Sequence, residues 1–167
     1  MILKFISAIF FIVAGAVAGG IRAENLRHNA DLCREILMLD EKISFCIRYK
    51  FSDVYEICRE LKDSDFKYLK FISNLPENYD YNENFHLSWE KAVYSQKNIP
   101  EKEKNILIII GNTVGTSDAE SQLNILNSLK AETELLKSQR DSEYEKKGRL
   151  FRSIGILAGI TAGILVI

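Results

Sequence analysis

Two uncharged apolar stretches lie at the ends of the chain, at residues 5–21 and 153–167. The 17 residues of the first stretch would extend about 25 Å as a helix, slightly less than the ~30 Å hydrocarbon core of a bilayer. Flanking residues supply the difference. The second stretch is shorter, but Leu150 and Phe151 extend it while Arg152 reaches toward the headgroups. The pattern therefore predicts transmembrane segments at residues 1–22 and 150–167.

Between these segments, apolar residues recur every three or four positions, as in amphipathic helices. Capping residues, proline and polar loops divide this region. The helices are expected to begin at six places: residue 24, residues 52–53, residues 63–64, residue 85, residue 100 and residues 117–118. In the last of these, Ser117 and Glu120 have the spacing of a capping box.

Six antiparallel helices return a chain to the membrane face from which it left, because their number is even. The predicted fold class is therefore all-α: an antiparallel six-helix bundle at residues 23–149, with a transmembrane helix at each end. In this topology the loops near residue 51, at residues 77–83 and at residues 113–117 lie together at the membrane-distal end.

Basic residues flank the inner side of both apolar stretches. Because positive residues are retained in the cytoplasm, this arrangement predicts a cytoplasmic central domain, with the basic cluster against anionic lipid headgroups. The cluster consists of Arg22, Arg27, Lys146, Lys147, Arg149 and Arg152.

A cleaved signal peptide is the alternative interpretation of the N-terminal stretch. Lys4, the apolar run and the small residues Ala16 and Ala18 suit one. The domain would then be an exported helical binding module. Basic residues beside the second stretch argue against export.

Small residues recur at four-residue spacing in both apolar stretches. Such stripes let helix backbones approach closely in lipid, so they predict transmembrane packing and association of copies through these helices. The glycines concerned are Gly15, Gly19, Gly155, Gly159 and Gly163.

Composition mainly excludes classes of partner and site. The formal net charge of −1 indicates no nucleic-acid partner. Three cysteines without a C-x-x-C pair, and two histidines, suit neither a disulfide framework nor a metal site, so buried free thiols are expected. The segment ILIIIGNTVGTS at residues 106–117 superficially resembles a phosphate-binding loop, but no lysine follows it. No catalytic residue, cofactor or metal is predicted, and the protein is not expected to be an enzyme.

Acidic residues gather in the predicted distal loops. They are interpreted either as solubilising loop residues or as a docking tip for a partner. The candidate docking residues are Asp80, Glu83, Asp118 and Glu120.

Motifs in the second half resemble the stage III sporulation protein AB family. The resemblance rests on SWEKAV at residues 88–93, on the spacing Gly111-x-x-Val114-Gly115-x-x-Asp118-x-x-x-Gln122, on LKAE at residues 129–132 and on RLFRSIGILAG at residues 149–159. The chain departs from the family where KFSDV at residues 50–54 replaces a Thr-Pro-Leu element. Phe151 and Ile154 replace the usual Tyr and Leu.

This resemblance implies a subunit of the channel complex between mother cell and forespore in endospore-forming bacteria. The family's cytosolic domain is similar to the inner-membrane platform domain of type II secretion systems. The implied role is a membrane platform in the mother-cell membrane facing the forespore. Its implied partners are a secretion-type cytoplasmic ATPase and other channel subunits.

Overall fold

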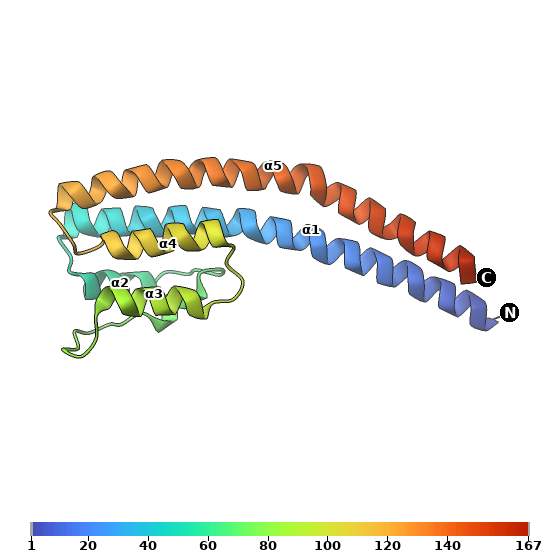
Figure 1. Ribbon diagram of the computed structural model, residues 1–167, viewed down its shortest axis with the longest axis horizontal. Coiled ribbons are helices and arrows are strands. Elements are labelled where there is room, and N and C mark those ends of the chain that lie inside the picture. The colour runs from blue at the N-terminus through green and yellow to red at the C-terminus, as the bar shows by residue number, and fades with distance from the viewer. Residues whose placement is uncertain (1, 167) are drawn as a thin grey trace. The chain divides into compact units, whose positions relative to one another are not determined.

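The computed structural model describes residues 2–166, which form five α-helices and no strand (Figure 1). The all-α class predicted from the sequence is therefore confirmed. Helix α1 is extended by one π-helical turn, Cys46–Lys50, and a 3-10 turn spans Lys70–Asn74. The helices are α1 (Ile2–Phe45), α2 (Val54–Lys62), α3 (Phe85–Ser95), α4 (Glu101–Thr113) and α5 (Ala119–Val166).

The prediction of a six-helix bundle is not confirmed, because the expected third helix is absent from the described residues. Residues 63–69 are not helical, and only the 3-10 turn Lys70–Asn74 follows them. Apolar residues in this segment are nevertheless buried: Leu69, Phe71 and Ile72 are each at most 4% exposed. The spacing predicted burial correctly and the backbone conformation wrongly.

Two side chains from other helices explain this difference. The carboxyl oxygens of Glu35 on α1 accept the backbone N–H groups of Lys67, Tyr68 and Leu69, at 2.8, 2.7 and 3.0 Å. The amide of Gln96, after α3, accepts from the N–H of Phe71 at 2.9 Å and donates to the carbonyl of Tyr68. These bonds satisfy backbone groups that a helix would otherwise pair internally.

The chain packs as two compact units, to which α1 and α5 both contribute. One, the helical unit, is Asp31–Lys137. The other, the apolar unit, combines Met1–Ala30 with Ser138–Ile167, of which residues 2–30 and 138–166 are described. The predicted membrane boundaries, after residue 22 and before residue 150, stay predictions.

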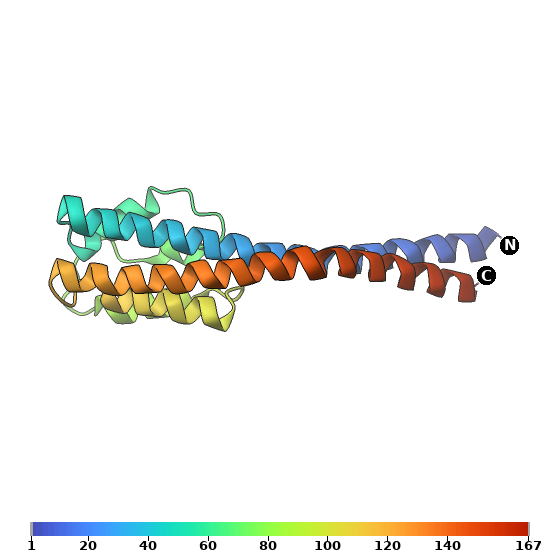
Figure 2. The same ribbon diagram turned by 90° about the horizontal axis from the view of Figure 1, so that it is seen from above.

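In the helical unit, α1 and α5 lie side by side, and α2 and α3 lie on the side of α1 and α4 that faces away from α5 (Figures 1 and 2). Its core contains Trp89, whose indole N–H donates to the carbonyl of Leu107 at 2.8 Å. The three cysteines are fully buried thiols, as predicted. The three- and four-residue spacing of Leu123, Leu126, Leu129, Thr133 and Leu136 predicts one inner face of α5; the last four are buried and Leu123 is partly buried.

In the apolar unit, the start of α1 and the end of α5 pack antiparallel (Figure 2). Both helices contain an apolar stretch long enough to cross a membrane, and only 11% and 17% of these stretches are buried. A helix in a soluble core would be mostly buried, whereas exposed apolar side chains suit contact with lipid. The exposed side chains include Ile9, Phe10, Val13, Val17, Leu150, Ile154 and Leu157.

Candidate functional site

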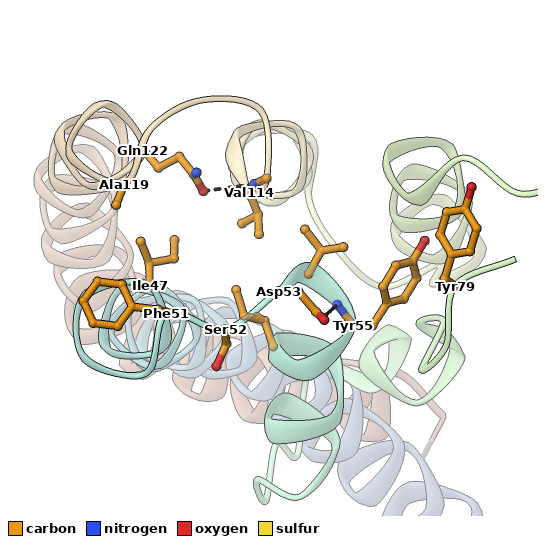
Figure 3. Close-up of a pocket in the computed structure, with 12 residues that line it drawn as sticks. Ile47, Phe51, Ser52, Asp53, Tyr55, Tyr79, Val114, Ala119 and Gln122 are labelled. Atoms are coloured by element: carbon orange, nitrogen blue, oxygen red, sulfur yellow. Dashed lines mark hydrogen bonds between the residues drawn. The ribbon is translucent and has the colours of Figure 1, made fainter. Parts of the chain in front are cut away.

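A cavity of about 590 Å³ opens at one end of the helical unit, where three loops meet (Figure 3). The loops are the α1–α2 connection, the polar segment before α3 and the α4–α5 turn, so the structure brings them together as the sequence predicted. Most lining side chains are apolar or aromatic, and Asp53 is the one with a formal charge. The lining consists of Ile47, Phe51, Ser52, Asp53, Val54, Tyr55, Ile57, Tyr79, Val114, Gly115, Ala119 and Gln122.

The first wall is shaped by the way α1 ends. Its π-helical turn closes with Phe51 in the left-handed conformation at φ 52°, and the N–H of Ser52 donates to the carbonyl of Cys46. Asp53 then starts α2 through a capping box. Its carboxylate accepts the N–H groups of Tyr55 and Glu56 at 2.8 Å, and the Glu56 side chain accepts the N–H of Asp53.

The opposite wall is the α4–α5 turn, which contains Gly115 at φ 78°. A Cβ on this glycine would lie 2.5 Å from Cγ1 of Val54, so the close approach also requires glycine. Gln122 closes the turn, because its side chain accepts the N–H of Gly115 at 2.9 Å and donates to the carbonyl of Ser117 (Figure 3). The Gly115 and Gln122 of the sequence motif are therefore turn-forming residues.

Three of the four predicted docking residues directly adjoin lining residues in the sequence, and none of the four lines the cavity itself. Asp80 directly follows Tyr79, and Asp118 and Glu120 flank Ala119, whereas Glu83 lies farther along the polar segment. The capping-box prediction needs correction, because Asp118 caps α5 in place of Ser117. Its carboxylate accepts the N–H and hydroxyl of Ser121 at 2.9 and 2.8 Å, and these bonds lower its pKa.

Sequence reasoning missed the apolar interior of the site, above all Phe51 and Tyr79. Tyr79 packs edge-on against Tyr55 with ring centroids 6.1 Å apart, yet it is 70% exposed. No local pattern joins these residues, because they come from loops almost thirty positions apart. The available signal was an aromatic residue directly after a helix end, where glycine is usual.

The predicted packing glycines lie in the apolar unit, where the structure pairs α1 with α5 of the same chain. A Cβ on Gly15 would lie 2.4 Å from the carbonyl oxygen of Gly155, and a Cβ on Gly159 would lie 2.8 Å from Cα of Ile12. Gly19 similarly faces Gly155, and Gly163 is buried. Association of separate copies through these glycines stays a prediction.

The basic cluster lies near another contact of the same unit. The Cβ of Ala23 is 3.9 Å from the position of a Cβ on Gly148. Arg22 adjoins Ala23, and Lys147 and Arg149 adjoin Gly148, so the two helices carry their positive charges at a similar level. Every member is exposed: Arg22, Arg27, Lys146, Lys147, Arg149 and Arg152.

Burial and placement of the titratable groups bear on the chemistry that the helical unit could hold. Burial raises the pKa of Cys58 to about 12, which keeps it a thiol at neutral pH. Among the described residues, no group of three or more His, Cys, Asp or Glu side chains is placed to hold a metal. Residues 106–113 belong to helix α4, so this segment is not a strand followed by a phosphate loop.

Comparison with known families identifies the chain. The family model described as stage III sporulation protein AB matches residues 4–167, and the chain therefore belongs to this family. It is a family of structural sporulation proteins, so membership implies a role in sporulation. Searches of curated proteins and of solved structures found no match.

Proposed function

We propose that this member of the stage III sporulation protein AB family is a platform subunit of the sporulation channel, a secretion-like apparatus between mother cell and forespore. Its two apolar segments anchor it in the mother-cell membrane facing the forespore, and its helical unit lies in the cytoplasm. There it docks a secretion-type ATPase and other channel subunits, without catalysis of its own.

The observation that carries this proposal is the antiparallel pairing of two exposed apolar helices, each flanked by basic residues. Glycine-to-glycine contact lets α1 and α5 pack as a hairpin, the form in which helices associate within lipid. The cationic flank shared by Arg22 and Arg149 favours the cytoplasmic side of the bilayer. This argument supports a cytoplasmic helical unit within reach of an ATPase.

The topology is tested by a single cysteine at Asn78, an exposed position in the polar segment before α3. The native thiols Cys33, Cys46 and Cys58 are fully buried, so the parent chain serves as the unlabelled control. Intact and lysed cells are treated with a membrane-impermeant maleimide. Labelling of N78C only after lysis is expected. Labelling in intact cells would instead indicate an exported binding module, which an N-terminus cleaved near Ala18 would confirm.

Docking is tested by capture of the apparatus's cytoplasmic ATPase with the full chain in detergent. Substitution of Asp80, Glu83 and Glu120 by Asn or Gln is expected to reduce capture at least tenfold with unchanged helicity. Asp118→Asn is tested separately, because its cap on α5 can change stability. If none of the four substitutions reduces capture, the acidic tip is not the docking surface. If the parent chain itself does not capture the ATPase, the ATPase is not its partner.

A further inference from the structure

Neither the backbone conformation at position 51 nor packing in the core accounts for a phenylalanine there. Phe51 has φ 52°, a conformation that glycine adopts without the steric cost imposed by a Cβ. Its side chain is 82% exposed, so burial does not offset that cost. The ring instead lines the mouth of the 590 Å³ cavity, on the opposite side from Tyr79 (Figure 3). A strained, exposed aromatic residue at a cavity is typical of a contact surface.

The cavity itself has the size and lining of a binding pocket. Pockets that bury a small ligand or side chain usually measure roughly 300–1,000 Å³ and are mainly apolar. Val54, Ile57 and Val114 form apolar walls, and Tyr79 adds aromatic surface that is 70% exposed. A large apolar side chain suits this interior better than a polar one.

Acidic residues predominate in the three segments that supply most of the cavity lining. Residues 51–56, 77–84 and 113–122 contain no lysine, arginine or histidine. Of their carboxylates, Glu77 is paired with Lys62 at 2.7 Å, and the nearest preceding cation, Lys50, is bonded to Glu60. The others form no ion pair with a described residue: Asp53, Glu56, Asp80, Glu83, Asp118 and Glu120.

We propose that this cavity receives a basic segment of a partner protein, which inserts one large apolar side chain between Phe51 and Tyr79. Lysine or arginine residues on both sides of this apolar side chain face the six carboxylates named above that form no ion pair with a described residue. The inference rests on the docking function proposed above and adds the chemistry of the bound segment. An acidic segment would be repelled, and a basic segment without the anchor would lose the apolar contact.

The test uses the full chain in nanodiscs of zwitterionic lipid, with empty nanodiscs as the control for lipid binding. The probes are three fluorescent heptapeptides: Phe flanked by three Lys on each side, the same peptide with Ser in place of Phe, and the same peptide with Glu in place of Lys. Fluorescence anisotropy is expected to show that the Lys-flanked Phe peptide binds at least tenfold more tightly than either of the other two peptides. Its affinity should also fall at least tenfold between 50 and 500 mM salt.

Two variants locate the binding. Phe51→Gly removes the ring and suits the left-handed backbone, so the unfolding midpoint is expected to stay the same or rise. The affinity for the Lys-flanked Phe peptide is expected to fall at least tenfold. The double substitution Glu83→Gln, Glu120→Gln should lower the affinity for the same peptide by a similar factor. The matched control is Glu132→Gln with Glu134→Gln, which removes two exposed charges on α5 and should leave binding unchanged.

The outcomes separate this inference from the proposed function. Equal binding of all three peptides, or binding unaffected by Phe51→Gly, overturns the basic-segment proposal even if the ATPase still docks. Dimerisation that Phe51→Gly abolishes would also overturn it, since a second copy would then occupy the cavity. Selective peptide binding without ATPase capture would support the cavity as a site for a basic segment. It would overturn only the proposal that the ATPase supplies that segment.

Discussion

Gly111 on α4 passes directly over the indole of Trp89 on α3. A Cβ at position 111 would lie 2.1 Å from Cδ1 of Trp89, far inside van der Waals contact. The indole is held in place, because its N–H is bonded to the carbonyl of Leu107 and its ring packs edge-to-face with Phe71 at a centroid distance of 5.6 Å. The first glycine of the family motif therefore sets how closely α3 and α4 pack.

Gly111→Ala is consequently expected to lower the free energy of unfolding by ~1–3 kcal/mol, the usual cost of an overpacked core. Trp89 is the sole tryptophan, so its fluorescence during denaturation reports on the helical unit directly. The neighbouring exposed residue supplies the control: Asn112→Ala should change stability by less than ~0.5 kcal/mol. Equal effects of the two substitutions would contradict the close contact.

The pairing of α1 with α5 in the apolar unit predicts a specific disulfide. The Cβ separation of 3.9 Å between positions 23 and 148 falls within the range of natural disulfides. Ala23→Cys with Gly148→Cys should therefore cross-link within one chain on mild oxidation, as seen by mass spectrometry after proteolysis. A Cβ on Gly20 has no neighbour within 4 Å, so Gly20→Cys with Gly148→Cys is the matched negative control.

The same cross-link measures the glycine contact. Gly15→Leu in the Ala23→Cys, Gly148→Cys chain should slow disulfide formation several-fold, because the carbonyl of Gly155 would stand 2.4 Å from the new Cβ. Gly20→Leu should leave the rate unchanged, since that position faces open space. A slowing by both substitutions alike would point to a general effect of bulk in the membrane segment.

Asp40 predicts an unusual dependence of stability on pH. It is 3% exposed, and its Oδ1 accepts no hydrogen bond from a described residue. Burial raises its pKa to about 7; nearby Lys130 lowers the pKa and Glu41 raises it, each by less. The folded state therefore retains a proton that the unfolded state has lost. Stability should fall as pH rises from about 4 to about 7, by up to ~1.4 kcal/mol per pH unit, and then level off.

Chemical denaturation of the parent and of Asp40→Asn between pH 4 and 8 checks this sign. The variant cannot ionise at position 40, so its stability should vary less over that range. Glu132→Gln provides the control, because Glu132 is an exposed carboxylate on α5 that does not contribute to the pKa shift of Asp40. A parent whose stability rises steadily up to pH 7 would show that Asp40 ionises normally.

Glu35→Ala should destabilise the helical unit by roughly 2–4 kcal/mol, since three backbone donors lose their acceptor together. Hydrogen exchange provides the local readout: the amides of Lys67, Tyr68 and Leu69 should lose protection more than those of α4. Glu41→Gln, which breaks an exposed ion pair with Lys130, serves as the comparison, with an expected cost below ~1 kcal/mol. Unchanged exchange at Leu69 would show that the carboxyl group does not hold this segment.

Local periodicity predicted the helices because their buried positions follow the helical repeat. Leu126, Leu129 and Leu136 define the inner face of α5 without knowledge of its partners. The same rule failed at Phe66–Ile72, where spacing suited a helix but Glu35, more than thirty positions earlier, supplies the hydrogen bonds. Periodicity measures burial, and it contains no information about distant side chains that bind a backbone.

The candidate site was predictable only in its charge. Asp80 and Asp118 belong to polar loops whose common location followed from the order of the helices. The cavity depends on the left-handed Phe51 and on a turn closed by Gln122, which are tertiary details. Residues from three separate loops had to be placed in space before an apolar interior could be recognised.

The bonds from Glu35 also set an order of events during folding. Each joins residues separated by 32 to 34 positions, and closing a loop of that length costs entropy before any contact offsets it. Segment 63–74 has little internal hydrogen bonding with which to nucleate, so it must wait until α1 presents its carboxyl group. In the finished protein, loss of the Glu35 bonds is accordingly expected to open this segment while the surrounding helices stay intact.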